Sequence, residues 1–284
     1  MIERRAFRAM GTDVELILRR NGTVDALDAA EQEFHRLEAL LSRFRPDSEL
    51  SRLNRVGSLL AGPDLRRVVQ LALEARKRTN GRFDPTVHDA LVHAGYDRTF
   101  DEVARDGGAV SCGVFEAGGS VRVDGERIQL GPGVRLDLGG IGKGYAAERA
   151  ADLLALAGDC LVNAGGDVAV RGGPWPIGLE TGSGPLTVEL SSGGVATSGR
   201  DRRHWRRGGR DLHHLIDPRT GKPSESDLLR VTVVGSDAVE AEATAKSLFL
   251  AGAARAVEEA DAERLPAVLV TADGRTLFAG GLAA

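Results

Sequence analysis

Helical and strand-like segments occur along this chain, but they do not alternate regularly with one another. A doubly wound parallel sheet requires regular alternation, so the pattern favours a mixed α+β fold. Helices are expected near residues 24–41, 64–79, 145–156, 238–251 and 253–265. Strands are expected near residues 12–18, 120–124, 127–130, 134–138, 160–163, 176–179, 186–190, 230–234, 268–271 and 276–279. The run Ser-Ser-Gly-Gly at 191–194 is expected to be a loop.

The sequence contains no internal repeat and no linker-like stretch. Residues 1–284 are therefore expected to form one domain, with two intertwined α+β subdomains as the alternative.

The charge balance limits the class of partner. The chain has 37 Lys and Arg against 41 Asp and Glu, a formal net charge of −4, which excludes a globally basic nucleic-acid binder. No run approaches the ~18 consecutive apolar residues of a membrane span, and the first residues contain no apolar signal-peptide core. The two cysteines, Cys112 and Cys160, form no disulfide framework and are interpreted as small core residues. We therefore expect a cytoplasmic protein with no membrane span and no nucleic-acid partner.

Glycines are enriched and clustered, making up about 13% of the chain against a usual ~7%. The cluster at 137–145, Asp-Leu-Gly-Gly-Ile-Gly-Lys-Gly-Tyr, leads from a predicted strand into a predicted helix. Unpaired backbone N–H groups at a helix start favour an anion, and Lys143 adds a full positive charge there. The phosphate-loop pattern does not match, because Gly144 stands where Ser or Thr is required. A strand–helix turn with an exposed lysine remains the alternative.

A second segment, residues 213–223, contains a histidine pair followed by turn residues. Adjacent residues of a strand point to opposite faces, so at most one of His213 and His214 serves a given site. We interpret His214 as a general acid or base; a hydrogen-bonded turn histidine is the alternative. Asp217 is expected to accept from a backbone N–H two residues on. The hydroxyls of Thr197 and Ser198, beside a glycine, are suited to phosphate oxygens.

An arginine-rich run and a Glu–Lys pair each have a structural explanation that requires no ligand. Six arginines between residues 200 and 210 suggest either phosphate or RNA binding, or a solvated hairpin arm. The net charge favours the hairpin arm, with one arginine available to a diphosphate. Glu242 and Lys246 lie four residues apart on a predicted helix, the spacing of an intrahelical ion pair that contributes ~0.2–0.5 kcal/mol at a surface.

Seven residue runs, in this order along nearly the whole chain, resemble the FAD:protein FMN transferase (ApbE) family. Any one of these motifs is weak, but their order and spacing together are specific. The runs are Met10-Gly11-Thr12, 42–54, 82–87 (Arg-Phe-Asp-Pro-Thr-Val), 137–145, 163–167 (Asn-Ala-Gly-Gly-Asp), 196–199 (Ala-Thr-Ser-Gly) and 214–221. The resemblance implies an ApbE-like α+β fold with mostly antiparallel sheets and flanking helices.

The same resemblance implies an activity: cleavage of the FAD diphosphate and transfer of FMN to a Ser or Thr hydroxyl of a target protein, with release of AMP. FAD is then a substrate, and the catalytic residues are His214, Lys143 and Asp217. His214 would accept a proton from the incoming hydroxyl. The FAD site would be lined by Met10, Phe44, Arg82, Phe83, Asp84, Asp137, Lys143, Thr197, Ser198 and Ile216.

The family also uses Mg²⁺, and at this site the chain departs from the family pattern. The resemblance implies that the Gly140 carbonyl and Glu242 are ligands, with Glu242 in the place of a usual Asp. Lys246 stands where the family has a Thr ligand, and a protonated lysine offers no lone pair. Either the Lys246 ammonium replaces part of the cation's role, or the chain binds FAD with little or no transfer. FAD diphosphatase activity, with water as the acceptor, is a third function compatible with the same residues. A smaller departure is Phe44 in place of a frequent Tyr.

Overall fold

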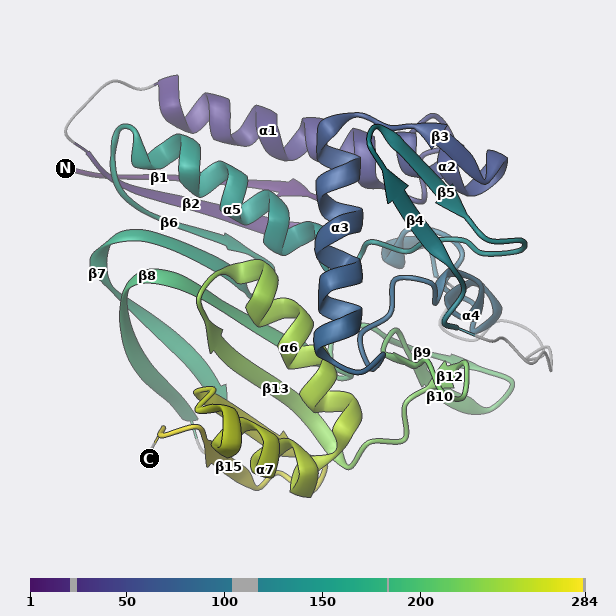
Figure 1. The fold of residues 1–284 in the computed structure, drawn as a ribbon. Coiled ribbons are helices and arrows are strands. Elements are labelled where there is room, and N and C mark those ends of the chain that lie inside the picture. Colours follow the sequence, from purple (N-terminus) through teal and green to yellow (C-terminus); the bar gives the residue numbers. More distant parts are fainter. Residues whose placement is uncertain (21–24, 104–116, 183, 283–284) are drawn as a thin grey trace. The chain divides into compact units, whose positions relative to one another are not determined.

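The computed structural model describes residues 1–20, 25–103, 117–182 and 184–282 (Figure 1). The chain divides into two compact units, each assembled from stretches that are far apart in sequence. Unit 1 comprises residues 1–38, 141–198 and 226–284, and unit 2 comprises residues 39–140 and 199–225. The expected helix cap at Thr23, the expected loop at 107–108 and the environment of Cys112 lie outside the described residues.

Unit 1 is built on an eight-stranded sheet with the order β1-β2-β6-β7-β8-β13-β14-β15. Neighbouring strands are antiparallel at β1–β2, β2–β6, β6–β7, β7–β8, β13–β14 and β14–β15. The strands are β1 (Ile2–Ala9), β2 (Thr12–Arg20), β6 (Gly158–Ala164), β7 (Asp167–Thr181), β8 (Gly184–Gly199), β13 (Leu228–Gly235), β14 (Ala267–Thr271) and β15 (Thr276–Ala279).

Three helices of unit 1 pack on this sheet. Helix α5 (Gly142–Ala155) contacts β6 and β7, α6 (Ala238–Ala251) contacts β13, and α7 (Ala253–Glu263) contacts β14 and β15. Helices α5 and α6 also contact each other, and Figure 1 shows them side by side. The interior face of α6 is rich in alanine, which allows close approach of neighbouring backbone. Helix α1 (Asp25–Leu41) begins in unit 1.

Unit 2 contains a three-stranded sheet with the order β3-β5-β4 and two short hairpins, β9–β10 and β11–β12. Its strands are β3 (Ser58–Leu60), β4 (Val121–Asp124), β5 (Arg127–Leu130), β9 (His204–Arg207), β10 (Arg210–His213), β11 (Ile216–Asp217) and β12 (Lys222–Pro223). Its helices are α2 (Glu49–Val56), α3 (Pro63–Arg78), α4 (His88–His93) and the 3-10 turn η1 (Phe100–Glu102). The arginine-rich segment therefore forms the expected hairpin arm, although its Trp205 is buried.

The structure confirms the α+β class and corrects several boundaries. Residues 134–138 do not form a strand; the N–H of Leu136 donates to the side chain of Asn54, and that of Asp137 donates to the carbonyl of Pro85. Helix α5 begins at Gly142 rather than at residue 145. Strand β1 and helices α2 and α4 were not expected from the sequence.

Residues 191–194 lie inside β8, so the expected loop there is wrong. Gly193 and Gly194 pair with Val170 and Ala169 of β7 and are buried. At Gly194 the start of α6 leaves no room for a side chain, because a Cβ would lie 2.2 Å from the backbone nitrogen of Ala238. Gly193 has a φ of 102°, and a Cβ there would lie 2.7 Å from the carbonyl oxygen of Gly235 at the end of β13.

We therefore expect Gly194→Ala to destabilise the protein by about 1–3 kcal/mol, the usual cost of forcing extra volume into a packed interior. The measurement is urea-induced unfolding followed by circular dichroism. Gly178→Ala in β7 is the matched control, because a Cβ there meets nothing within 4 Å. Equal stability of the two variants would contradict the close contact between β8 and α6.

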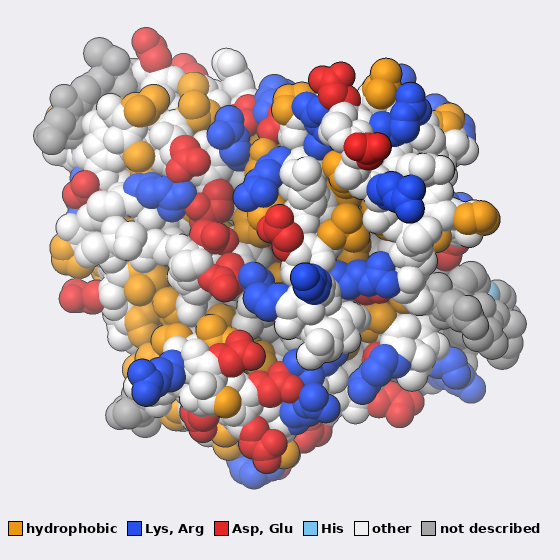
Figure 2. All heavy atoms as spheres, viewed as in Figure 1, with side chains coloured by type: hydrophobic (Ala, Val, Ile, Leu, Met, Phe, Trp, Pro, Cys, Tyr) orange, Lys and Arg blue, Asp and Glu red, His pale blue; other side chains and the backbone are white. Residues whose placement is uncertain are grey.

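No helix in the described part of the chain is long and apolar enough to cross a membrane. On the face drawn in Figure 2, Lys and Arg side chains are interspersed with Asp and Glu side chains. Mixed charge of this kind is typical of an exposed protein surface.

Candidate functional site

Unit 1 contains a group of four ionised side chains, Lys143, Asp167, Glu242 and Lys246, which we call the ion cluster. Lys143 Nζ lies 2.5 Å from Asp167 Oδ2 and 2.6 Å from Glu242 Oε1. Lys246 Nζ lies 3.1 Å from the same Glu242 oxygen. Glu242 Oε1 is therefore shared by two ammonium groups. The expected Glu242–Lys246 pair exists, but it is not a surface pair, since the Glu242 side chain is only 1% exposed.

Helices α5 and α6 bring the ion cluster together. The other Glu242 oxygen, Oε2, accepts the backbone N–H of Gly144 at 3.0 Å, in the first turn of α5. A carboxylate at this place satisfies an unpaired helix N–H and complements the helix dipole. Gly144 has no room for a side chain, because a Cβ would lie 2.8 Å from the Ala238 carbonyl oxygen. One of the N–H donors expected to serve an anion is thus already used by Glu242.

Burial and mutual attraction or repulsion shift the pKa values of the ion-cluster side chains away from their ordinary values. Burial alone would raise the pKa of Glu242, but Lys143 and Lys246 outweigh it and hold the pKa at about 2. Burial and then repulsion from Glu242 raise the pKa of Asp167 to about 6. Burial also lowers the pKa of the Lys246 ammonium, against the attraction of Glu242. Shifts of opposite sign on two neighbouring carboxylates are typical of functional sites.

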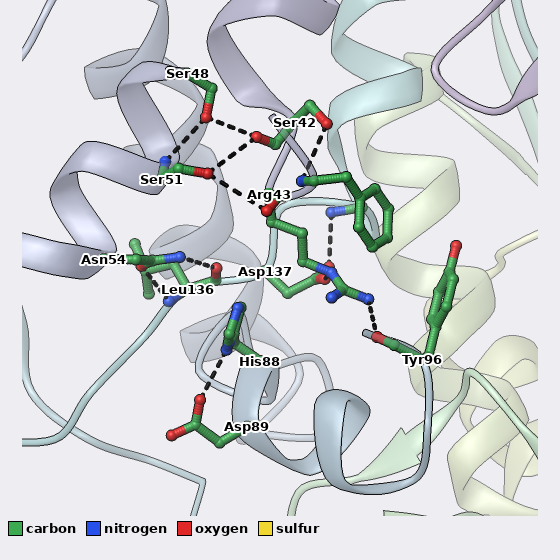
Figure 3. Close-up of polar contacts among 12 residues, drawn as sticks. Ser42, Arg43, Ser48, Ser51, Asn54, His88, Asp89, Tyr96, Leu136 and Asp137 are labelled. Atoms are coloured by element: carbon green, nitrogen blue, oxygen red, sulfur yellow. Dashed lines mark hydrogen bonds and ion pairs between the residues drawn. The ribbon is translucent and has the colours of Figure 1, made fainter. Parts of the chain in front are cut away.

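Unit 2 places Arg43 at the centre of a second polar group (Figure 3). Its Nε lies 2.5 Å from Asp137 Oδ2, and its Nη2 donates to the Tyr96 carbonyl at 2.6 Å. Asp137 Oδ1 accepts the Gly139 N–H at 2.8 Å. Both oxygens of the predicted site residue Asp137 are therefore engaged, and the carboxylate orients the glycine loop that follows it.

The Arg43 guanidinium also stacks on two aromatic rings. Its carbon lies 4.1 Å from the centroid of Phe44 and 4.8 Å from that of Tyr96. Tyr96 contacts Trp205 with ring centroids 5.7 Å apart, and Trp205 Nε1 donates to the Ala94 carbonyl at 2.8 Å. Ile216 belongs to the same apolar group, which we call the aromatic cluster: Phe44, Tyr96, Trp205 and Ile216. Two predicted site residues, Phe44 and Ile216, are thus brought together.

The predicted site residues at 82–84 follow the end of α3. Asp84 is buried, and its carboxylate lies 3.1 Å from Arg76 Nε and accepts from both the N–H and the hydroxyl of Thr86. Phe83 is also buried, whereas Arg82 is half-buried. Asp84 therefore fixes the conformation of this loop.

The two adjacent histidines have different environments, as the strand geometry predicts. His213 is buried; its Nε2 lies 2.9 Å from the Ser224 carbonyl and its Nδ1 lies 3.2 Å from the Leu215 nitrogen. These partners assign a neutral ring that donates through Nε2 and accepts through Nδ1. His214 is half-buried, and its Nδ1 lies 3.4 Å from the Arg203 carbonyl. His213 therefore has a structural role, and its buried ring is not placed to exchange a proton with a ligand.

The His213 environment predicts a pH dependence of stability. Burial lowers the pKa of His213 below its ordinary value of 6.5, so the unfolded chain binds this proton more readily than the folded chain. The contribution of His213 to the free energy of unfolding is thus expected to fall as the pH drops below about 6.5. Chemical unfolding at several pH values measures the slope, and His213→Asn should flatten it. A parent-like slope in His213→Asn would contradict the assignment.

The remaining predicted residues are distributed over both units. In unit 1, Met10 occupies the β1–β2 turn with a left-handed φ of 53°, and Thr197 Oγ1 lies 2.9 Å from Thr232 Oγ1. Among the described residues, the buried hydroxyl of Ser198 has no hydrogen-bond partner. In unit 2, Gly140 lies in the turn before α5, and Asp217 accepts the Arg219 N–H at 2.9 Å, as expected.

Four residues of these groups were not singled out by the sequence: Arg43, Tyr96, Asp167 and Trp205. Arg43 and Asp167 lie within two of the seven runs, at 42–54 and 163–167, which was the available signal. No local signal marks Tyr96, because its role depends on packing against residues more than 50 positions away.

This α+β protein thus combines a lysine–carboxylate cluster at a glycine-rich helix start in unit 1 with an arginine–aromatic group in unit 2. The chain belongs to the ApbE family, whose model matches residues 10–269. It is similar to FAD:protein FMN transferases of Salmonella typhimurium, with 28% identity covering 88% of this chain and 80% of that one, and of Haemophilus influenzae, with 27% identity covering 93% and 84%.

The fold agrees with this assignment. The crystal structure of the ApbE protein of Thermotoga maritima matches with a TM-score of 0.87, covering 98% of this chain and 97% of that one at 24% identity. The Pseudomonas stutzeri flavinyl transferase ApbE matches with a TM-score of 0.82. The predicted ApbE-like fold with mostly antiparallel sheets is therefore confirmed.

Proposed function

We propose that this chain is an FAD:protein FMN transferase, which cleaves the FAD diphosphate, attaches FMN to a Ser or Thr hydroxyl of a target protein and releases AMP. The observation that supports this most is the family match over residues 10–269, together with relatives of that activity aligned over most of both chains. Charge and cysteine content support action in the cytoplasm without a nucleic-acid partner.

The aromatic cluster suits the flavin end of the substrate. Phe44 is only partly buried and offers an aromatic face to a planar ring, while the buried side chains of Tyr96, Trp205 and Ile216 pack in the same group and support it. Aromatic faces stack on planar rings at low entropic cost, because few side-chain torsions need to be fixed. Arg43 holds both Phe44 and Asp137 in place, so we assign it to positioning rather than to chemistry. Met10, Arg82, Phe83 and Asp84 are assigned to the lining of the same substrate.

Polar groups of the chain suit the diphosphate. The Ser198 hydroxyl has an unused hydrogen-bonding capacity, and Thr197 lies beside it on β8. Lys143 supplies a positive charge at the start of α5. Such a charge suits the negative charge that builds up on phosphate oxygens during cleavage of a diphosphate. Asp217 supports the turn after His214 through its bonds to Arg219.

The transfer itself requires one proton acceptor. The hydroxyl oxygen of the target attacks the FMN phosphorus, and its proton passes to His214. A phosphorus–oxygen bond forms to the target as the phosphorus–oxygen bond to AMP breaks. AMP leaves with the bridging oxygen, so atoms and charge balance without a redox step.

The test is incubation with FAD and the protein acceptor of the Salmonella typhimurium relative. Released AMP is measured by chromatography and protein-bound flavin by in-gel fluorescence. We expect both products in equal amounts. FMN formed without covalent flavin would identify the diphosphatase alternative, and bound but intact FAD would identify a binding protein without transfer. Absence of FAD binding would reject all three functions.

A further inference from the structure

We propose that the Lys246 ammonium supplies, within the ion cluster, the positive charge for which the family pattern implies a divalent cation, so that this chain handles FAD without a metal. This inference rests on the proposed function, because FAD is the ligand whose handling is considered. It goes beyond that function by assigning a charge-supplying residue and a metal-independent reaction.

The first argument is the use of the Glu242 oxygens. Oε1 is contacted by Lys143 at 2.6 Å and by Lys246 at 3.1 Å, and Oε2 accepts the Gly144 N–H at 3.0 Å. A Mg²⁺ ion binds carboxylate oxygens at about 2.0–2.1 Å and demands a near-octahedral set of oxygen ligands. An ion at Oε1 would have to displace at least one ammonium group from the place it occupies.

The second argument is the chemistry of the available donors. Protonated lysines offer no lone pair to a metal. The described residues contain no group of three or more His, Cys, Asp or Glu side chains arranged to hold a metal ion. The expected ligand set of Glu242 and the Gly140 carbonyl is therefore not completed by Lys246, and the side chains of the ion cluster do not fit a divalent cation.

The third argument is charge balance. The ion cluster contains two ammonium groups and two carboxylates, so its formal charge is already zero. Glu242 and Asp167 are 1% and 3% exposed, and the two lysines are 14% and 15% exposed. Adding two positive charges to a balanced, largely buried group is unfavourable, because buried charge without a partner is costly.

The fourth argument is that an ammonium group can donate hydrogen bonds to phosphate oxygens and offset their negative charge. It carries three donors, and the bond to Glu242 leaves up to two of them for phosphate oxygens. The Lys246 side chain is 15% exposed. Glu242 fixes the ammonium one helical turn away on α6, which removes part of the entropic cost of ordering a long side chain.

Metal binding is tested directly on the full chain after treatment with EDTA and desalting. Titration with MnCl₂, followed by the electron paramagnetic resonance of free Mn²⁺, should show no bound equivalent. This readout does not depend on FAD. A bound Mn²⁺ equivalent that disappears in Glu242→Gln would overturn the proposal, whatever the activity.

FAD handling is tested in parallel. Flavin fluorescence measures FAD affinity and chromatography measures AMP release, each in EDTA and in MgCl₂. The native chain should give the same values in both buffers. Activity present only with MgCl₂ would overturn the metal-independent reaction and leave the transferase proposal intact. Lack of FAD binding in both buffers would instead reject the transferase proposal and this one with it.

Variants assign the effect to Lys246. Lys246→Met should weaken FAD binding by about 10–100-fold, the loss of one charged hydrogen bond, without rescue by MgCl₂. Lys77→Met, at an exposed lysine of α3, should behave as the native chain. Lys246→Thr restores an oxygen ligand and should become stimulated by MgCl₂, which keeps the test decisive if the Met variant folds poorly. A Thr variant with native activity in EDTA would show that the ammonium is dispensable.

Discussion

Replacing His214 by glutamine is expected to lower the rate of AMP release from FAD by about 10²–10⁴-fold, the usual contribution of a positioned general base. Glutamine retains an amide that can donate to the Arg203 carbonyl, which lies 3.4 Å from His214 Nδ1. It cannot accept a proton from the attacking hydroxyl near neutral pH. We therefore expect FAD affinity, measured by flavin fluorescence, to be unchanged while turnover is lost.

His204→Gln is the matched control for this prediction. The His204 ring also lies against a backbone carbonyl, that of Asp201 at 2.8 Å, but the residue is exposed on the β9 strand of the same arm. It should retain the native rate. Native turnover in His214→Gln would exclude His214 as the base, whereas loss of FAD binding in that variant would indicate a role in holding the substrate instead.

Local sequence patterns predicted those elements of the fold that carry their own signals. Helix α6 was predicted with its observed bounds, and the hairpins at β4–β5 and β14–β15 follow turns at Gly125-Glu126 and Asp273-Gly274. The patterns failed where contacts with distant parts of the chain determine the secondary structure. Residues 134–138 alternate like a strand, yet their backbone bonds go to Asn54 and Pro85 rather than to a ladder. Gly193 and Gly194 were expected in a loop, but they lie in β8, where the end of β13 approaches Gly193 and the start of α6 approaches Gly194.

The site was predictable as a set of motifs, but not as a set of contacts. Spacing alone indicated the Glu242–Lys246 pair, and it is present. Spacing could not show that Lys143, 99 residues earlier in the chain, shares the same carboxylate oxygen, or that the pair is buried. The burial arises because Gly144, in the first turn of α5, allows the start of α6 to approach closely. Because of this packing, the predicted Glu242–Lys246 pair is not a weak surface ion pair. It belongs to a buried group of four charges that interact strongly with one another.

Glu242→Gln is expected to lower the free energy of unfolding by about 3–5 kcal/mol, because removing one partner of a buried ion pair leaves charge without compensation. The substitution keeps the size of the side chain and its ability to accept the Gly144 N–H. It changes the formal charge of the ion cluster from zero to +1, with Lys143 and Lys246 facing Asp167 alone. Thermal and urea-induced unfolding measure the loss.

A double variant distinguishes lost charge balance from lost packing. Glu242→Gln combined with Lys246→Met returns the formal charge of the ion cluster to zero, so it should be more stable than Glu242→Gln alone. Neighbouring ionised groups typically couple by about 0.5–3 kcal/mol in such cycles. Glu126→Gln, at a 74% exposed carboxylate paired with Arg66, is the control and should change stability by less than about 1 kcal/mol. Additive effects of the two substitutions would contradict charge coupling within the ion cluster, since each residue would then act independently of the other.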